Sequence, residues 1–190
     1  MRHATTLLEP SIETERLIIR PPGEADRDGI VAEVNDFAVT RMLAKVPHPY
    51  GLADADAYLS SIKRDGRQSL QLSITHDGRI VGGIGISDIN AGCEFGYWLG
   101  RTHWGKGYAT EAGRGFLAYF FGTYDIGRVR SGVFVDNPAS LHVQEKLGFE
   151  QTGRREVFCV ARGHSVAHVD TVLTRDRFSA LQDYQRTLQD

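Results

Sequence analysis

The chain has 190 residues, of which 41% are hydrophobic and 24% are charged, and its formal net charge is −2. This length and composition predict one globular domain that buries enough apolar surface to fold without disulfide or metal staples. The nearly balanced charge argues against a broad nucleic-acid footprint and against a polybasic membrane surface.

The cysteines and the apolar runs bear on where the protein works. Cys93 and Cys159 form no C-x-x-C pair, which indicates reduced thiols rather than a disulfide. Residues 1–8 carry no charged-then-apolar leader pattern, and the longest apolar run, over 116–121, is too short to span a bilayer. We therefore expect a cytoplasmic protein with no membrane partner and no nucleic-acid partner.

Two of the scattered histidines, His164 and His168, stand four residues apart. On a helix this spacing can join two metal ligands, but the valines around them indicate a strand, where it does not. The sequence therefore predicts no metal site.

Hydrophobic periodicity predicts the elements of the first half of the chain. Two prolines end the first strand, and His76-Asp77-Gly78 suits a hairpin turn. In chain order we expect a strand over 12–20, a helix over 23–35, a loop over 47–50, a helix over 54–64, and strands over 70–75, 79–87 and 94–99.

The second half alternates helices and strands. Asn137 can cap a helix, Pro138 suits its first position, and Gly148 suits a left-handed end. The expected elements are helices over 109–121 and 137–147, strands over 128–135, 151–160 and 168–174, and a polar helical tail over 175–190. This order favours an α/β fold, a mixed sheet with helices on both faces, in a single domain over 1–175 followed by a tail over 176–190.

The richest segment, Gly96 to Ala112, places a glycine loop between an aromatic strand and a helix. Unpaired N–H groups at a helix N-terminus, together with the helix dipole, favour phosphate oxygens. Gly100 to Gly107 reads G-x-x-x-x-G-K-G, but Gly107 stands where a nucleotide-triphosphate loop needs Ser or Thr to hold Mg²⁺. The loop thus favours a diphosphate held without metal, and a purely structural turn is the other interpretation of the loop alone.

A second segment, Asn137 to Phe149, carries the helix punctuation described above. Together with Glu15-Arg16-Leu17, Gly96 to Leu99 and the loop Gly105 to Ala112, it resembles the GCN5-related N-acetyltransferase family. Within that family the chain is most similar to the branch that acetylates ribosomal-protein N-termini (RimJ/RimL). The pieces span nearly the whole chain in the right order, and the loop and the Leu147-Gly148-Phe149 helix end are the specific parts.

The resemblance implies a central mixed sheet of about seven strands in which two parallel neighbours splay apart. It also implies that acetyl-coenzyme A, without a metal, enters the gap as a co-substrate. The aromatic strand would pair with the pantetheine arm, and the loop N–H groups would hold the pyrophosphate. The residues assigned to acetyl-coenzyme A in this way are Tyr97, Trp98, Leu99, Trp104, Gly105, Lys106, Gly107, Tyr108, Ala109, Thr110, Asn137 and Ser140.

Two positions depart from the family pattern. Trp104 stands where the family loop opens with Gln or Arg, but the contact there is largely through the backbone, so we expect binding to persist. Gln144 stands where many members carry a tyrosine acid, and Ser140 then becomes the expected acid by analogy with this branch. A first-turn hydroxyl bonded to the backbone is the other interpretation of Ser140.

Acetyl transfer to an amine needs a polarised thioester, a neutral amine and a proton for the leaving thiolate. The expected catalytic residues are Leu99, whose N–H would stabilise the oxyanion, Ser140 as the acid, and Glu94 as a base acting through water. Glu94 could instead be an exposed strand-end carboxylate. Glu111, in the first turn of a helix, is expected to be structural. The alternative bases are Glu156, His103 and His142.

No motif identifies the acceptor amine, which is either a protein N-terminus or a small molecule. Phe37, Tyr50 and Trp98 could line its pocket or belong to the core. An active N-acetyltransferase, monomeric or homodimeric, is the principal interpretation. A coenzyme A-binding regulatory domain without catalysis stays open because the tyrosine acid is missing, and a transferase of a longer acyl group would need a roomier pocket near Trp98.

Overall fold

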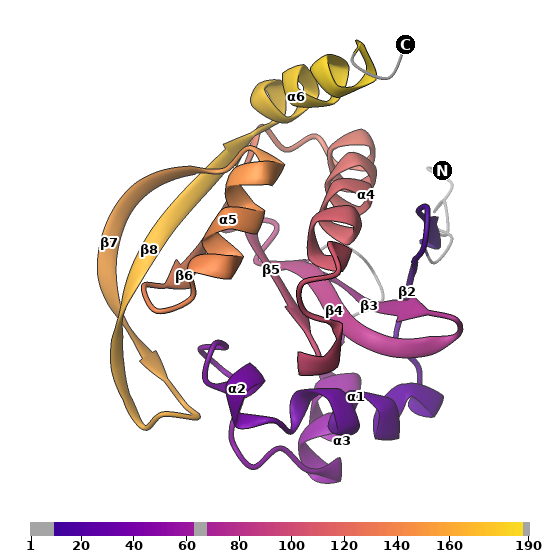
Figure 1. Ribbon diagram of the computed structural model, residues 1–190, viewed down its shortest axis with the longest axis vertical. Helices are drawn as coiled ribbons and strands as arrows, with labels where there is room; N and C mark the ends of the chain where they lie inside the picture. The colour runs from indigo at the N-terminus through magenta and orange to yellow at the C-terminus, as the bar shows by residue number, and fades with distance from the viewer. Residues whose placement is uncertain (1–9, 63–67, 188–190) are drawn as a thin grey trace, which may run out of the picture.

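The computed structural model describes residues 10–62 and 68–187, and these form one sheet of eight strands (Figure 1). The strands are β1 (Ile12–Glu13), β2 (Ile18–Arg20), β3 (Leu70–His76), β4 (Arg79–Ser87), β5 (Glu94–Leu99), β6 (Arg128–Phe134), β7 (Glu150–Cys159) and β8 (His164–Thr174). Their order across the sheet is β1-β2-β3-β4-β5-β6-β8-β7. Neighbouring strands are antiparallel except β5 and β6, which run parallel. The predicted mixed sheet is confirmed, with eight strands rather than about seven.

Helices flank the sheet on both faces. The helices are α1 (Arg27–Val34), α2 (Phe37–Thr40), α3 (Leu52–Ser61), α4 (Tyr108–Thr123), α5 (Pro138–Leu147) and α6 (Arg175–Thr187), with single 3₁₀ turns at Glu24–Asp26 and Arg101–His103. Figure 1 shows α1, α2 and α3 gathered at one end of the molecule and α4 beside α5. The helix prediction thus holds in number and order, apart from the short α2.

Alternation along β5 divides its side chains between two apolar clusters. Phe95 lies against Phe116 of α4, with the ring centroids 6.0 Å apart. Trp98 points to the opposite face because it lies three residues further along the strand. There it packs against a smaller buried cluster made of Ile30, Val34, Tyr50, Ala55 and Ile80. The sheet therefore has an apolar layer on each face.

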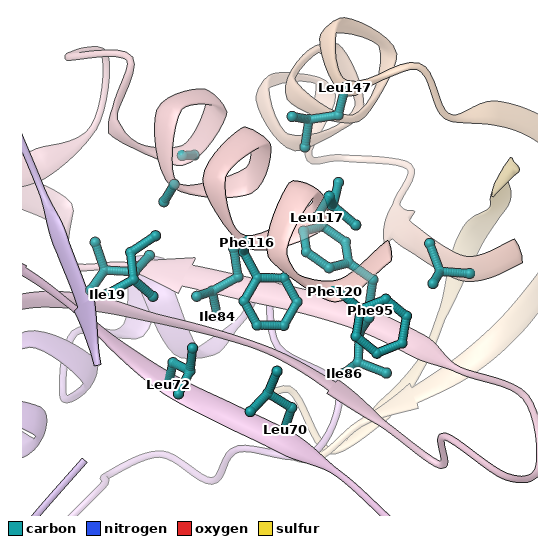
Figure 2. Close-up of a cluster of buried hydrophobic side chains, with 14 of the residues drawn as sticks. Ile19, Leu70, Leu72, Ile84, Ile86, Phe95, Phe116, Leu117, Phe120 and Leu147 are labelled. Atoms are coloured by element: carbon teal, nitrogen blue, oxygen red, sulfur yellow. The ribbon is translucent and has the colours of Figure 1, made fainter. Parts of the chain in front are cut away.

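The larger cluster fills the space between α4 and the sheet (Figure 2). Its largest fully buried side chains include Leu72, Ile74 and Ile86 of the sheet and Phe116, Leu117 and Phe120 of α4. Burying a side chain of this size contributes roughly 1.5–3 kcal/mol. The layer therefore fixes β5 and α4 relative to one another, and these are the two elements on either side of the glycine loop.

Three differences from the sequence prediction have local causes. The strand expected over 12–20 is broken because the N–H of Thr14 donates to the Leu17 carbonyl (2.9 Å) and closes a turn. The unexpected α2 forms because the Asp36 side chain caps it, accepting from the Ala38 N–H (2.8 Å). The helix expected over 54–64 begins at Leu52 instead, because the Asp54 side chain accepts from the Gly51 N–H (2.8 Å) and caps the helix there. Its expected end, the leader region 1–8 and the last residues of the tail lie outside the described residues.

The C-terminal helix α6 is docked on the rest of the domain. Phe178 is buried against Phe121 of α4, with the ring centroids 5.6 Å apart. Arg175 donates to the carbonyls of Phe121, in the last turn of α4, and of Tyr124 and Ile126, which follow that helix. The polar tail is therefore helical as predicted, and its first residue caps another helix.

Within the described residues, no helix is both long and apolar enough to cross a bilayer. Over the same ranges, no three His, Cys, Asp or Glu side chains are grouped so that they could hold a metal ion. Cys93 and Cys159 are both buried and free, in agreement with the predicted reduced thiols.

Replacing Phe116 by alanine is expected to lower the free energy of unfolding by about 3–5 kcal/mol, because it leaves a large cavity under α4. Phe158 on the edge strand β7 is 57% exposed, so Phe158→Ala is a matched control. The control should change stability by less than about 1 kcal/mol. Urea denaturation followed by circular dichroism measures both, and equal losses would contradict the assigned core.

Candidate active site

The two parallel strands share only a short stretch of pairing. Arg130 of β6 pairs in register with Glu94 and donates its N–H to the Cys93 carbonyl (2.8 Å). The next residue, Ser131, donates its hydroxyl to the Phe95 carbonyl (2.8 Å). Past this point the described parts of β5 and β6 share no ladder pair, so the strands part and leave a gap. We call the point at Phe95 and Ser131 the fork.

The backbone of β5 past the fork offers hydrogen-bonding groups to the gap. Gly100 donates its N–H to the Val81 carbonyl of β4 (3.0 Å). Because N–H groups alternate in direction along an antiparallel strand, the N–H of Trp98 also points to β4. Those of Tyr97 and Leu99 point the other way, into the gap. The gap can therefore accept one further extended chain beside β5.

A cavity of about 950 Å³ occupies the gap and is lined from both faces of the sheet. Ser140 and Val143 of α5 line it on one face, and Tyr50 and Tyr58 line it on the other. This volume lies at the upper end of the range for small-molecule sites. It suits a long ligand on one face that meets a second ligand on the other.

The glycine loop lies at one end of the cavity, where Trp104, Gly105 and Ala109 line it. Gly105 (φ +72°) and Gly107 (φ +80°) adopt the left-handed region that favours glycine. Gly107 caps α4 without a side-chain hydrogen bond, and the first helical bond begins only at the N–H of Glu111. The N–H groups before it are left for an anion.

The glycine loop is joined to α4 by an arginine that pairs with a carboxylate of that helix. Arg16 pairs with Glu111 of α4 (2.6 Å), donates to the Lys106 carbonyl (3.0 Å), and lies 4.8 Å over the Tyr108 ring. Thr14 donates its hydroxyl to Glu111 (2.6 Å). Burial alone would raise the pKa of Glu111, but the hydrogen bonds from Thr14 and Arg16 bring it below its ordinary value. These contacts agree with the prediction that Glu111 is structural.

Trp104 fastens the loop to β5. Its indole N–H donates to the Leu99 carbonyl (2.9 Å), while 44% of the residue stays exposed. The carbonyl of Leu99 is therefore occupied, and its N–H remains directed into the gap. The aromatic side chain thus has a structural use at the position where the family pattern has Gln or Arg.

Helix α5 presents Ser140 to the cavity. The Asn137 side chain accepts from the Ser140 N–H (3.1 Å), and Pro138 occupies the first turn, as predicted. The Ser140 hydroxyl lies 2.8 Å from the Tyr97 hydroxyl, so its partner is a side chain and not the backbone. Burial raises the pKa of Tyr97 to about 12, with the Ser140 bond opposing it. Tyr97 therefore keeps its proton at neutral pH.

Gln144 belongs to a buried polar network behind the fork. Its Nε2 donates to the Ser131 hydroxyl oxygen (2.9 Å), and its Oε1 accepts from the Thr171 hydroxyl (2.6 Å). Both ends of the amide are thus engaged, and the side chain braces Ser131. This agrees with the expectation that Gln144 does not act as an acid.

The cavity wall opposite α5 is aromatic. The Trp98 indole lies over Gly83, where an added Cβ would come 2.5 Å from its Nε1. Tyr50 and Tyr58 continue the wall, and burial raises the pKa of Tyr58 to about 12. Phe37 is 45% exposed and lies outside the lining. Of the three aromatics considered for the acceptor pocket, Tyr50 and Trp98 line the cavity and Phe37 does not.

The hairpin of β7 and β8 is bonded to segments that line the cavity. Arg162 in its turn donates two bonds to Asp136 (2.9 and 3.0 Å), which also accepts from Arg41 (2.6 Å). The Val160 N–H donates to the Ala44 carbonyl (3.0 Å). Hydrogen bonding from Arg162 holds the pKa of Asp136 below its ordinary value. We call this set of contacts the hairpin clasp.

Comparison with known proteins decides the class. The family described as "Acetyltransferase (GNAT) domain" matches residues 16–150, which is well over half of the chain. The chain belongs to the GNAT family. Its mixed sheet is the GNAT fold, and membership makes the protein an acyltransferase, as the sequence predicts.

Individual relatives agree with this assignment. The uncharacterized N-acetyltransferase p20 of Bacillus licheniformis is 26% identical over 162 residues, covering 82% of this chain and 91% of p20. RimL, a ribosomal L7/L12 alpha-N-protein acetyltransferase solved with coenzyme A, has a TM-score of 0.78 at 17% identity, covering 88% and 99% of the two chains. Spermidine N-acetyltransferase from Vibrio cholerae, solved with coenzyme A and spermine, has a TM-score of 0.74 at 18% identity, covering 86% and 98%. The two structures share the GNAT fold with this chain.

The residues that the sequence assigns to acetyl-coenzyme A fall into two groups. Those lining the cavity are Tyr97, Trp98, Leu99, Trp104, Gly105, Ala109, Asn137 and Ser140. Those outside the lining are Lys106, Gly107, Tyr108 and Thr110. In the second group, the Tyr108 side chain is buried and Gly107 has no side chain. Only backbone groups of Gly107 and Tyr108 are therefore available to a ligand.

The expected catalytic residues Glu94, Leu99 and Ser140 all line the cavity. The alternative bases do not. His103 lies 3.5 Å from the Glu33 carboxylate, outside the lining. The alternatives that also lie away from the cavity are His142, whose side chain is 64% exposed, and Glu156 on the edge strand β7.

The sequence prediction gives no chemical role to two cavity groups, the phenol of Tyr97, a residue assigned only to cofactor binding, and the imidazole of His168. Alternation along β5 puts Tyr97 on the face of Phe95, so its approach to α5 could have been foreseen. His168 reaches the site because β8 lies directly beside β6, and no local pattern gives that strand order.

Glu111→Gln is expected to lower the free energy of unfolding by about 1–2 kcal/mol at pH 7, because it removes the charge that pairs with Arg16. The pKa of Glu111 is lowered in the folded protein, so this stabilisation is present above the ordinary value of 4.5 and is lost as pH falls through the folded value. Urea denaturation between pH 7 and pH 3 measures it. Glu145→Gln, at a carboxylate 51% exposed on α5, is the control. A difference from wild type that does not shrink in acid would contradict the assignment.

Proposed function

We propose that this protein is an acetyl-coenzyme A-dependent N-acetyltransferase that moves an acetyl group onto a primary amine by direct attack in a ternary complex. One observation carries the proposal: a single cavity joins the glycine loop, the open edge of β5 and an aromatic wall on the other face. A donor held at the loop and an amine held at the wall would meet between Tyr97 and Ser140.

Acetyl-coenzyme A would be bound mainly by backbone groups, and the proposal needs no metal ion. The N–H groups from Gly105 to Thr110 would hold the pyrophosphate, since α4 leaves its first donors unpaired. The gap-facing groups of Tyr97 and Leu99 would pair with the pantetheine arm. Asn137 and Ser140 would lie against its thiol end.

Four groups would carry the chemistry. The Leu99 N–H would stabilise the oxyanion, and loss of such a donor typically costs about 10²–10³ in rate. Ser140 would protonate the leaving thiolate, and the Tyr97 hydroxyl beside it would return a proton to Ser140. Glu94 on the acceptor face is the base that the sequence predicts, and its negative charge favours a cationic amine.

The proposed acceptor is a protein N-terminus or a small-molecule amine, in a cytoplasmic protein that acts as a monomer or homodimer. RimL is named for a protein N-terminus, and the Vibrio cholerae enzyme is named for a polyamine. Both acceptor classes are cationic amines. The aromatic wall with Glu94 beside it suits that chemistry.

Thiol release from acetyl-coenzyme A is the direct test, with spermidine, a free amino acid, an aminoglycoside and an unblocked peptide as acceptors. Steady turnover with any amine supports the proposal. Calorimetric binding of coenzyme A without turnover would point to a regulatory domain. Faster turnover with a longer acyl donor would point to a different acyl group, and absence of binding would refute the proposal.

Gly105→Val is expected to weaken coenzyme A binding by at least about tenfold, because a β-branched residue is strained at positive φ and crowds the anion site. An added Cβ at Gly105 meets no protein atom, so the fold should persist. Gly122→Ala in α4, which also meets no atom, is the control and should bind normally. Calorimetry gives both affinities. Unchanged affinity in Gly105→Val would argue against the loop as the pyrophosphate site.

Ser140→Ala is expected to lower kcat by roughly 10–10², since a thiolate leaving group with a pKa near 8.5 departs without full protonation. The KM for acetyl-coenzyme A should change little. Tyr97→Phe keeps the ring packing and should give a smaller loss. Steady-state kinetics at saturating amine measures both variants, and a wild-type kcat in Ser140→Ala would remove Ser140 from the proposed acid role.

A further inference from the structure

A histidine and a carboxylate form a pair on the acceptor face of the sheet. His168 and Asp170 stand two residues apart on β8, so their side chains share a face. Nδ1 of His168 lies 3.0 Å from Oδ1 of Asp170. Because an ionised carboxylate only accepts hydrogen bonds, Nδ1 carries the proton and Nε2 keeps its lone pair.

The Nε2 atom of His168 lies beside the fork. Gly132 follows Ser131 on β6, and a Cβ added at Gly132 would come within 2.9 Å of this Nε2. The absence of a side chain at Gly132 thus makes room for the imidazole. His168 lines the same cavity as Leu99 and Ser140, and only 12% of its side chain is exposed.

Three charged groups and one aromatic ring surround the imidazole. Asp170 also accepts two bonds from Arg155 of β7 (2.8 and 3.1 Å). The negative charge of Glu94 of β5 raises the pKa of the imidazole, in opposition to burial. Phe134 of β6 meets the ring edge-on, with the centroids 5.7 Å apart. Burial lowers the pKa of His168, and the bond to Asp170 opposes this only in part. The ring is therefore neutral at pH 7 and able to accept a proton.

We propose that His168, oriented by Asp170, is the base that takes the proton from the acceptor amine, an assignment that rests on the proposed acetyl transfer. The amine reacts in its neutral form, after the ammonium has released one proton to solvent. Its nitrogen forms a bond to the thioester carbonyl carbon, and a second proton passes from that nitrogen to Nε2 of His168. The carbon–sulfur bond then breaks, its electron pair leaves with sulfur, and sulfur takes a proton from Ser140. His168 releases its proton to solvent, and Ser140 regains one from solvent through Tyr97, so the protons balance.

The surroundings favour His168 over Glu94 in this role. A base held by a third group stays in one orientation toward the nucleophile, as His168 is held by Asp170. Glu94 is exposed at the start of β5 and no side chain fixes its carboxylate in the contacts described. The charge of Glu94 is then left to draw the cationic amine toward the cavity.

The first test compares His168→Gln with His142→Gln in the full chain, by thiol release from acetyl-coenzyme A with the same amine panel. We expect His168→Gln to lower kcat by about 10² or more, since a positioned general base typically contributes 10²–10⁴. The KM for acetyl-coenzyme A should stay the same. His142 is 64% exposed, so its variant should keep the wild-type kcat. A wild-type kcat in His168→Gln would overturn the proposal.

The second test uses the wild-type protein and so does not depend on a variant that folds. The rate must fall in acid as His168 gains a proton. The protonation of the same imidazole can be followed by ¹⁵N NMR, once its ring nitrogen resonances are assigned to His168 by through-bond correlations. We expect the ring to titrate at the pH of the acid limb of kcat/KM, and the limb to stay in place for two amines of different basicity. A limb that moves with the basicity of the amine would overturn the assignment, as would a ring that titrates elsewhere.

Failure of this proposal and failure of the proposed function give different results. If acetyl transfer itself is wrong, the wild-type protein shows no acetyl-coenzyme A binding in calorimetry or no thiol release with any amine, and both proposals fall. If only the base is wrong, the wild-type protein turns over and His168→Gln matches it. Asp170→Asn adds a further check, since it should lower kcat while leaving coenzyme A affinity unchanged.

Discussion

At the fork, the hydroxyl of Ser131 bonds to the Phe95 carbonyl, and the pairing of β5 with β6 goes no further. The open edge of β5 and the cavity beside it both follow from that interruption. On one face Gln144 braces Ser131 through a buried bond. On the other face the missing side chain of Gly132 admits an imidazole. Two consecutive residues of β6 thus lie where the sheet opens, Ser131 in contact with the α5 face and Gly132 in contact with His168 on the other face.

An open edge inside a protein has an energetic consequence. Backbone N–H groups removed from water without partners cost free energy, so the gap favours a ligand that supplies the missing strand edge. The sheet tolerates the gap because each half is anchored separately. The aromatic layer under α4 fixes β5, whereas β6 is held by its full antiparallel pairing with β8. Packing on one side and strand pairing on the other therefore hold the split open.

Much of this arrangement could be predicted from the sequence, because the residues that indicate it act on the backbone next to them. Asn137 and Gly148 mark the two ends of α5, and Gly105 and Gly107 mark the loop, since each has a backbone geometry that few other residues serve. The alternation of β5 indicates which of its side chains meet α4. What the sequence did not reveal has two origins. The break near Thr14 and the four-residue α2 rest on single local hydrogen bonds, which hydrophobic periodicity does not register. The approach of His168 to Gly132 depends instead on a contact between distant segments.

The hairpin clasp has an evolutionary implication. Residues 42–46 line the cavity, and a few hydrogen bonds, among them those of Asp136 and the Val160 N–H, join this segment and its neighbour Arg41 to a turn more than a hundred positions later in the chain. Polar ties of this kind at a rim tolerate replacement more readily than a packed interior does. The half that would hold the acceptor can thus be remodelled by exchanging two segments, whereas the aromatic side chains packed under α4 constrain the half that would hold the donor.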